Sequence, residues 1–399
     1  MTRGMEGTER NEVSSELRAR LEEAGARAAH QLRRTIRDWP AHRPAPIHTA
    51  GGRWYRPSDL WTDWTPGFYA GQMWILHKLT QDNFWREHAE EHTRKLAVRR
   101  FDRDVHDLGF IFLSSYRRWL DAIDLDHPLA THIIDTLVTA ATVQSYRFND
   151  NGQDGFIYSF NGPQSLFIDV MMNVRLLFWA RDYGAPNAVW RRAIEHSRTT
   201  LKHLVRRDGR ELGAEDGSVA HEAIFNTEPG RGEFRCLSTQ QGYSPFTCWS
   251  RGLAWAIYGF AEAYRYSGEP DFLSTAERCS RFYLERTPEN GVPFWDYGAP
   301  GIPSEPLDSS AAAVAGSGLW ILASLTRDAE LSRRARAMTL TIAQTLTSDE
   351  FSGAKKEGEE GVLLHSTYHR PRGWGVDEST MWGDYFFLEL VERLLAEAS

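Results

Sequence analysis

Cysteine is scarce in this chain of 399 residues, which has only Cys236, Cys248 and Cys279. Three widely spaced cysteines without a Cys-x-x-Cys pair argue against a disulfide framework and against a cysteine-ligated zinc site. The chain also lacks any uncharged apolar run of the roughly 18 residues that a membrane span needs. Its charged N-terminus has no apolar core of the kind found in secretory signal peptides. We therefore expect a soluble, cytoplasmic protein with no membrane partner.

An excess of positive charge is lacking as well. The chain has 54 acidic and 46 basic residues and a formal net charge of −8. This argues against a nucleic-acid partner, because binding a polyphosphate backbone requires clustered lysine and arginine. Neither of the common glycine-rich nucleotide-binding motifs occurs. Residues 88–92, "HAEEH", match a short zinc pattern, but they are typical of the solvated face of a helix, and we expect no metal there.

Aromatic residues, in contrast, are abundant. They make up 12% of the chain and include 15 Trp. Trp and Tyr rings stack on sugar rings as well as filling protein cores. The chain has 41% hydrophobic residues, enough for a sizeable core. Composition alone is therefore compatible with a carbohydrate ligand.

Helical periodicity dominates the chain and predicts twelve helices in pairs. Their ranges are 11–37, 65–79, 83–98, 108–121, 128–147, 163–183, 187–206, 247–267, 270–286, 309–325, 328–348 and 379–396. In most pairs an apolar helix rich in small residues precedes an amphipathic one rich in Arg and Glu. Six such pairs predict an all-α (α/α)6 barrel. The alternative is an open solenoid, but the repeat lengths are too uneven for a regular one.

Long segments interrupt the pattern before several apolar helices, at residues 148–162, 207–246, 287–308 and 349–378. Loops of this length in a compact domain are usually functional. We expect them to gather at one end of the barrel and to surround a cleft. No linker is evident, so we expect one catalytic domain over residues 1–399, with residues 1–50 forming an N-terminal helix and lead-in.

Two carboxylates lie at or near the starts of apolar helices. Asp107 follows His106 in "DVHDLGF", and Asp169 lies in "SLFIDVMMN", one turn before Asn173. Asp107 could be an ordinary helix cap. If both side chains face one apolar cleft, the two cannot both ionise cheaply, and the pKa of one is raised. Such a pair supplies an acid and a base near neutral pH.

Polar residues also gather around the start of the helix predicted at 247–267. Gln241 precedes it, and Trp249 and Arg251 flank its first turn. An Arg at the mouth of an acidic cleft suits a ligand carboxylate, although a salt bridge to a structural Asp is an alternative. His221 lies in a long loop and, taken by itself, has the character of a surface histidine.

Taken together, these motifs resemble those of the unsaturated glucuronyl hydrolases, glycoside hydrolase family 88. The similar segments, in order, are "DWTPGFYAGQMW", "HDLGF", "SLFIDVMMNVRLLFWA", "TQQGYSPFTCWSRGLAWAIYGFAEAYRYSG", "GVPFWDY", "LDSSAAAVAGSGLW" and "DESTMWGDYFFLE". They extend from about residue 60 to about residue 395. The resemblance implies an (α/α)6 barrel that uses neither metal nor cofactor and acts on oligosaccharides ending in an unsaturated uronic acid.

The resemblance also implies residue roles. Family members hydrate the C4–C5 double bond of the terminal sugar, and the resulting hemiketal opens and releases the sugar as a keto acid. Asp169 matches the residue that protonates C4 and helps to activate water at C5, and Asp107 matches the second essential carboxylate. The positions that match the lining of the sugar site are Trp64, Phe68, His106, Phe160, His221, Gln241, Trp249 and Arg251.

The chain departs from the family pattern at several positions. Gln240 replaces a frequent His, Pro245 and Phe246 replace acidic residues, Leu253 replaces a frequent Gln, and Phe160 stands where Trp is common. These departures concern the preferred substrate. The alternatives are an unsaturated rhamnogalacturonyl hydrolase, an ordinary inverting glycosidase and a non-catalytic sugar-binding toroid. The parent glycan and the oligomeric state do not follow from the sequence.

Overall fold

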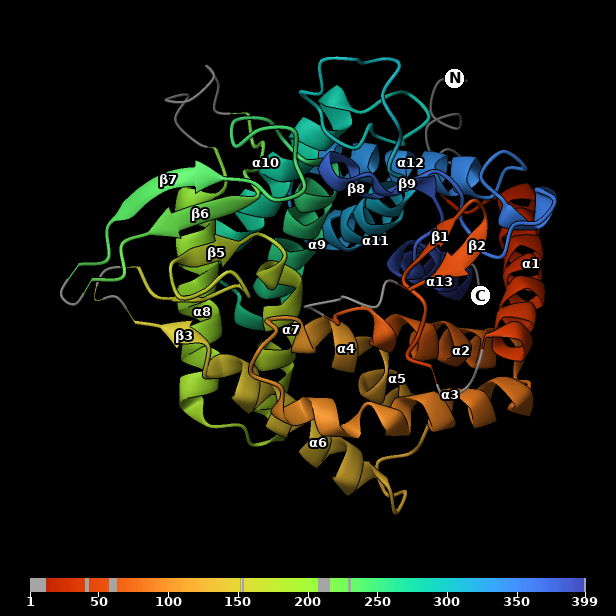
Figure 1. Ribbon diagram of the computed structural model, residues 1–399, viewed down its shortest axis with the longest axis horizontal. Helices are drawn as coiled ribbons and strands as arrows, with labels where there is room; N and C mark the ends of the chain where they lie inside the picture. The colour runs from red at the N-terminus through yellow and green to blue at the C-terminus, as the bar shows by residue number, and fades with distance from the viewer. Residues whose placement is uncertain are drawn as a thin grey trace, which may run out of the picture.

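The computed structural model describes residues 12–39, 43–56, 63–150, 152, 154–206, 216–228 and 231–397. Helices dominate the described residues, and they form two concentric rings around a common axis (Figure 1). Among these residues, no helix has both the length and the apolar character that crossing a membrane requires.

The inner ring is closed. It consists of α2 (Pro66–Thr80), α4 (Leu108–Ser114) with its continuation α5 (Tyr116–Asp121), α7 (Val170–Ala180), α9 (Ser250–Ser267), α11 (Ser309–Leu325) and α13 (Met381–Glu397). Each of these helices contacts the next, and α13 returns to contact α2. An open solenoid would leave its first and last inner helices apart. The predicted (α/α)6 barrel is therefore confirmed.

The outer ring covers the inner one. It consists of α1 (Ser15–Asp38), α3 (Asn83–Lys95), α6 (Ala130–Ser145), α8 (Asn187–His203), α10 (Pro270–Arg286) and α12 (Ala329–Leu346). The inner helix α11 is buried along nearly its whole length, whereas the outer helix α3 buries only Trp85, Ala89 and Thr93. This difference explains why the inner helices are apolar all round and the outer ones are amphipathic.

Glycine allows two inner helices to approach each other beside the predicted carboxylates. A Cβ atom on Gly109 would lie 2.4 Å from the backbone of Asn173, so any larger residue would push α4 away from α7. Since Asp107 lies at the start of α4 and Asn173 lies in α7, the glycine brings these two side chains within reach of each other.

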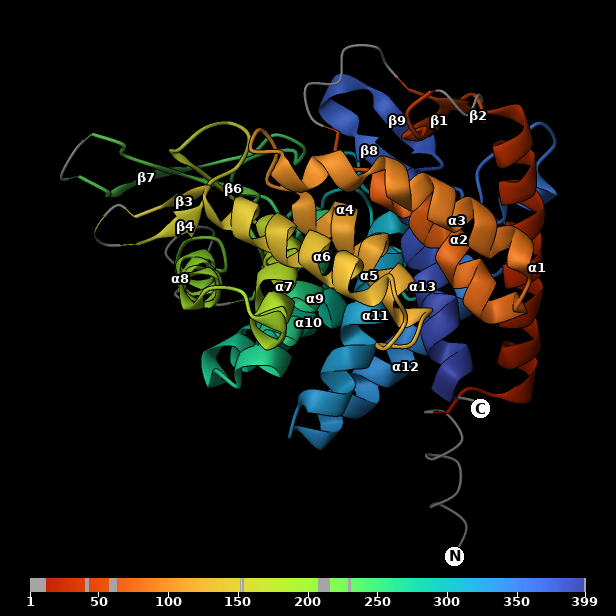
Figure 2. The same ribbon diagram turned by 90° about the horizontal axis from the view of Figure 1, so that it is seen from below.

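Short β-sheets lie at one end of the barrel (Figure 2). The paired strands are β1 (His48–Ala50) with β2 (Arg53–Tyr55), β3 (Phe148–Asn149) with β4 (Phe156–Ile157), β5 (Ser165–Phe167) with β6 (Glu222–Phe225) and β7 (Phe234–Ser238), and β8 (Ser366–His369) with β9 (Trp374–Glu378). Most of these strands lie in the long interrupting segments. The expectation that those segments gather at one end agrees with this arrangement, although residues 207–215, 229 and 230 lie outside the described part.

Two of the predicted helices differ most from the structure. The helix expected at 163–183 begins only at Val170, because Ser165–Phe167 forms β5 and pairs with β6. The helix expected at 108–121 is broken at Ser115, which has φ −116° and ψ −81°. Pairing with a strand some 50 residues away leaves no trace in local periodicity. Of the predicted first helix, residue 11 lies outside the described residues.

The opposite end of the barrel carries a charged network. Arg118 bonds to Glu389 and Glu392, and Arg393 pairs with Glu389, beside a cavity of about 270 Å³ that Arg175 also lines. The inner helices end here, where their carbonyl groups create partial negative charge that arginine offsets. We assign this network to stability.

Candidate active site

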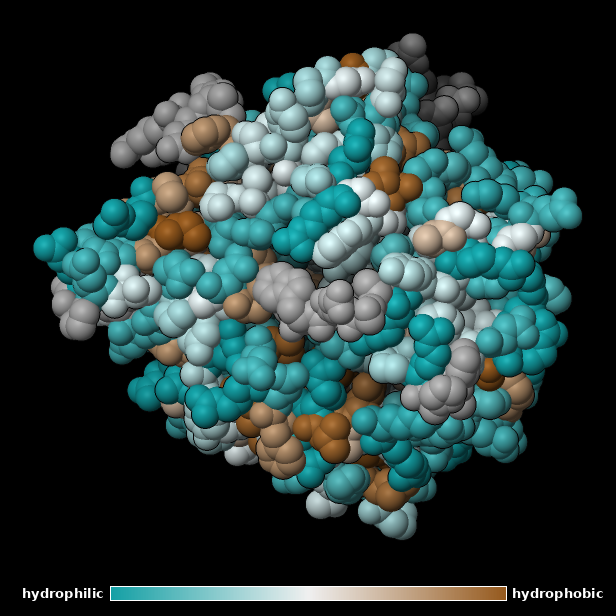
Figure 3. Space-filling model, in the orientation of Figure 1, coloured by the Kyte–Doolittle hydropathy of each residue, from teal (hydrophilic) through white to brown (hydrophobic). Residues whose placement is uncertain are grey.

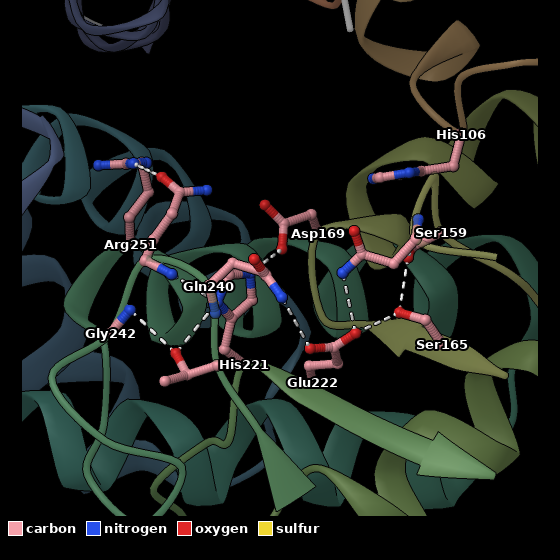
Figure 4. A network of polar contacts seen from close by, with 12 residues as sticks. His106, Ser159, Ser165, Asp169, His221, Glu222, Gln240, Gly242 and Arg251 are labelled. Atoms are coloured by element: carbon pink, nitrogen blue, oxygen red, sulfur yellow. Dashed lines mark hydrogen bonds and ion pairs between the residues drawn. The ribbon is translucent and has the colours of Figure 1, made fainter. Parts of the chain in front are cut away.

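The starts of four inner helices bring the predicted site residues to one end of the barrel. Asp107, Asp169, Trp249 and Asp308 are the N-cap residues of α4, α7, α9 and α11. Figure 4 shows Asp169 between His106 and Arg251, which come from different elements. Parallel inner helices that all begin at the same end make this convergence a consequence of the fold.

Asp107 occupies a cap position but does not cap its helix through its side chain. The first N–H groups of α4 donate elsewhere: that of Gly109 to the Gln144 amide oxygen (3.1 Å) and that of Phe110 to the Asn173 amide oxygen (2.7 Å). The Asp107 carboxylate accepts a hydrogen bond from Asn173 Nδ2 (3.2 Å). The side-chain cap interpretation of Asp107 is therefore wrong. Asn173 lies one turn after Asp169, but its side chain holds Asp107 and reaches only the backbone oxygen of Asp169.

A neutral histidine lies beside Asp107. His106 Nε2 is 3.3 Å from Asp107 Oδ1, and His106 Nδ1 accepts the backbone N–H of Phe160 (3.2 Å). Burial lowers the pKa of His106 to about 3, so the ring carries a single proton, which lies on Nε2. Burial, together with the negative charge of Asp169, raises the pKa of Asp107 to about 8.

Asp169 has its own histidine. His221 Nε2 lies 3.4 Å from Asp169 Oδ2, and His221 Nδ1 accepts backbone N–H groups from Gln240 (3.1 Å) and Gln241 (3.3 Å). A nitrogen that accepts N–H groups carries no proton, so the ring proton of His221 lies on Nε2, which faces Asp169. Burial acts to raise the pKa of Asp169, but the His221 hydrogen bond and nearby positive charge outweigh it and hold that pKa below its ordinary value.

The protonation order of the two carboxyls is the reverse of the expected one. The resemblance implies that Asp169 protonates C4, so Asp169 was expected to be the member of the pair that holds the proton. In the structure, Asp107 retains a proton near neutral pH and Asp169 is ionised. At Asp169, His221 and nearby positive charge outweigh the effect of burial, whereas at Asp107 burial and the negative charge of Asp169 outweigh the Asn173 hydrogen bond. The pair still holds one proton and one negative charge.

Arg251 does not have the free guanidinium that a carboxylate clamp needs. Its terminal nitrogens bond to Asp308 (2.5 Å), to the carbonyl oxygens of Thr367 (2.6 Å) and Tyr368 (2.7 Å), and to Gln241 Oε1 (2.6 Å). Arg251 and Asp308 are both almost fully buried. The clamp interpretation is wrong, and the alternative of a salt bridge to a structural Asp describes the geometry. Through Gln241, Arg251 still reaches the site.

The hydroxyl groups of the segment before α13 are not free to bind a ligand carboxylate either. Ser366 Oγ bonds to Ser309, Thr367 Oγ1 donates to the Leu307 carbonyl oxygen, and Ser379 Oγ donates to Glu359. All three side chains are buried. They stabilise the loop that packs against the start of α13.

The aromatic residues divide into exposed and covered ones. Trp64 is half-buried and packs against Phe68, Phe110 and Trp382, whereas Phe68 is almost fully buried behind this cluster. Phe68 therefore supports the expected sugar-binding wall but does not form its surface. Phe160 stacks on His106 with ring centroids 5.0 Å apart.

Trp249 lies between two polar groups of the site. Its ring is 4.6 Å from that of His221, and the Arg251 guanidinium lies 4.5 Å from its centroid. Trp249 is buried and fixes both neighbours.

Three residues stabilise the site although no sequence motif pointed to a role for them. Gln144 accepts from Gly109 N–H and donates to the His106 carbonyl oxygen, which fixes the turn before α4. Asp308 pairs with Arg251, and Glu222 accepts a hydrogen bond from Gln240, whose backbone N–H donates to His221. Each acts through another residue and not on the substrate, so none of them belongs to a motif of substrate-contacting residues.

Replacing Arg251 tests its structural role. Arg251→Ala leaves the Asp308 carboxylate buried and unpaired, which typically costs about 3–5 kcal/mol in the free energy of unfolding. We expect urea denaturation to show a loss of this size. Arg281→Ala, which removes an exposed pair with Asp328, is the matched control and should cost about 0–1 kcal/mol. A loss no larger than that of the control would contradict the structural role of Arg251.

Several proteins of known activity are similar to this chain. No family model matches the chain. The chain is 32% identical over 336 residues to the unsaturated glucuronyl hydrolase of Formosa agariphila, an alignment that covers 83% of this chain and 80% of that protein. It belongs to the unsaturated glucuronyl hydrolase family. The resemblance inferred from the ordered motifs is thereby confirmed.

Other members of the family are similar to this chain in sequence and in structure. The unsaturated chondroitin disaccharide hydrolase of Streptococcus pyogenes is 30% identical over 346 residues, which cover 83% of this chain and 81% of that one. The crystal structure of the unsaturated glucuronyl hydrolase from Bacillus sp. GL1 superposes with a TM-score of 0.81 at 30% identity and covers 94% of this chain and 96% of that one. Within the described residues, no cluster of three His, Cys, Asp or Glu side chains is arranged to hold a metal ion.

Proposed function

We propose that this protein removes the 4,5-unsaturated uronic acid from the non-reducing end of lyase-generated oligosaccharides by hydrating the C4–C5 double bond. Family membership supports the reaction. The observation that carries it in this chain is the carboxyl pair, which holds one proton and one negative charge near neutral pH. Protonation of C4 needs an acid, and activation of water for C5 needs a base.

Asp169 is the carboxyl that meets the reacting carbons in this proposal. Its side chain is 14% exposed, against 5% for Asp107. Docking of an anionic sugar beside Asp169 disfavours the ionised carboxylate, so the proton held by Asp107 shifts to Asp169 and from there to C4. Asp169 then accepts a proton from the water that attacks C5. The hemiketal opens, and the glycosidic oxygen leaves as a hydroxyl.

Gln241 is the candidate ligand for the sugar carboxylate. Arg251 holds its amide oxygen, so its NH2 group is the part of the amide left to donate to a ligand. Trp64 supplies the half-buried aromatic surface for the ring. The remaining expected site residues, His106, Phe160, His221 and Trp249, surround or orient the carboxyl pair.

A panel of unsaturated disaccharides tests the function. Unsaturated uronides absorb in the ultraviolet, and hydration removes the double bond, so absorbance should fall as product forms. New reducing ends without loss of absorbance would indicate an ordinary glycosidase, and binding without turnover would indicate a sugar-binding toroid. Preference for a rhamnose-linked substrate would favour an unsaturated rhamnogalacturonyl hydrolase. Variation of linkage and sulfation across the panel identifies the parent glycan.

Cytoplasmic location is proposed on the state of the cysteines. Cys236 and Cys248 are free thiols, as expected in a reducing compartment. We propose a single catalytic domain, supported by the closed ring and by the packing of α1 against α13.

A further inference from the structure

A buried carboxylate lies below the carboxyl pair and takes no part in the chemistry proposed above. Glu222, in β6, is 1% exposed. Its Oε1 accepts hydrogen bonds from Ser165 Oγ (2.5 Å) and Asn161 Nδ2 (3.1 Å), and its Oε2 accepts one from Gln240 Nε2 (3.3 Å). Within the described ranges, Glu222 forms no ion pair with Lys, Arg or His.

Such a group is expensive to bury. An ionised carboxylate loses its hydration, and neutral donors recover only part of the loss. An apolar residue would fill a strand position next to the core at lower cost. Two of the groups that donate to Glu222 are the side-chain amides of Asn161 and Gln240, which lie at the partly exposed border of the site. This arrangement indicates a positioning role for Glu222.

An amide that donates its NH2 group to Glu222 must direct its carbonyl oxygen elsewhere. In the described part of the chain, neither Asn161 Oδ1 nor Gln240 Oε1 has a hydrogen-bond partner. Figure 4 shows Gln240 between Glu222 and Asp169, beside His221. The neighbouring Gln241 has the opposite orientation, because Arg251 holds its oxygen. Two buried charges of opposite sign thus orient two adjacent glutamines in opposite senses.

We propose that Glu222 is a positioning residue that turns the Gln240 and Asn161 carbonyl oxygens toward the terminal sugar, where they accept hydrogen bonds from its ring hydroxyls. The inference rests on the function proposed above. A hydroxyl satisfies these oxygens, whereas a sulfate ester offers only acceptors and places negative charge against them. The substrate class is therefore an unsaturated uronic acid with free hydroxyls.

Glu222→Gln tests the inference. The new amide oxygen must take the Oε1 position, where two donors meet, so its NH2 faces Gln240. Gln240 then turns its carbonyl inward and its NH2 toward the sugar. Substrates with a hydroxyl, a hydrogen or a sulfate ester at C2, and a parallel set at C3, distinguish the two orientations. Glu228→Gln, an exposed acid on the same hairpin, is the matched control.

For the wild-type enzyme at one carbon at least, we expect kcat/KM to fall about tenfold when the hydroxyl is replaced by hydrogen and about a hundredfold or more when it is replaced by sulfate. In Glu222→Gln the sulfate ratio should shrink to about threefold or less, because the Gln240 NH2 group then faces the sugar and can donate to a sulfate oxygen. The hydrogen ratio should change less, because a hydroxyl can accept from an NH2 group as well as donate to a carbonyl oxygen. In Glu228→Gln both ratios should stay unchanged. A wild-type sulfate ratio that persists in folded Glu222→Gln, or a wild-type enzyme indifferent to all three substituents, would overturn the inference.

A second variant covers the case in which Glu222→Gln does not fold. Gln240→Met removes one acceptor with little change in volume. The fall in kcat/KM when the substrate hydroxyl is replaced by hydrogen should therefore be smaller in this variant than in the wild-type enzyme. An unchanged fall overturns the contribution of Gln240. Failure of the proposed function is a different result. It would appear as an absence of ultraviolet absorbance loss for every unsulfated substrate.

Discussion

Asp169→Asn should leave the barrel folded and lower kcat by about 10⁴-fold, the upper end of the range for loss of a general acid–base group. The amide has the same shape but can neither hold the proton destined for C4 nor accept one from water. Ground-state binding should change little, because Trp64 and Gln241 remain. Loss of ultraviolet absorbance under saturating substrate measures kcat, and circular dichroism checks the fold.

Asp182→Asn provides the matched control for this variant. It is the same substitution at an exposed position just after α7, and it should retain wild-type kcat. A purified, folded Asp169→Asn enzyme with more than a tenth of wild-type kcat would show that Asp169 does not transfer the proton.

Asp107→Asn should also inactivate the enzyme, by about 10²-fold or more, through loss of the stored proton. The wild-type kcat/KM should decline above about pH 8, where Asp107 loses its proton. That decline should be absent from the residual activity of the variant. Asn caps a helix as well as Asp does, so a helix cap alone would survive this change. Asp104→Asn, at an exposed position in the same loop, is the control.

The same variant should be more stable than the wild-type protein at neutral pH. Between the ordinary pKa of an aspartate and about 8, the folded protein keeps a proton on Asp107 that the unfolded chain has lost. The free energy of unfolding therefore decreases as pH rises through this window, by about 1.4 kcal/mol per pH unit. Asn removes this dependence, and below about pH 4 the advantage should vanish. Urea denaturation at pH 4 and pH 7 measures it; equal stability at both values would place the proton elsewhere.

Family and fold class could be predicted from the sequence because both depend on patterns that are local or repeated. Alternating apolar and amphipathic helices imply a double ring, and inner helices that all begin at one end imply that Asp107 and Asp169 converge. A carboxylate near the start of an apolar helix is visible without coordinates. These features require only periodicity and order along the chain.

The roles of individual polar residues could not be predicted in this way. Arg251 looked like a ligand for an anion, and only the structure places Asp308 against it, 57 residues later. The order of protonation could not be predicted either. It depends on which nitrogen of His221 carries the ring proton, and the backbone N–H groups of Gln240 and Gln241, which follow β7, decide this.

The sequence by itself determined the barrel, the carboxyl pair and the class of reaction. Tertiary structure decided which carboxyl keeps the proton, which guanidinium is already occupied and which way the side-chain amides of Gln240 and Gln241 are turned. The physical reason is that burial and hydrogen bonding act over a few ångströms in space. Glu222 receives donors from residues 161, 165 and 240, and no local pattern records that they meet.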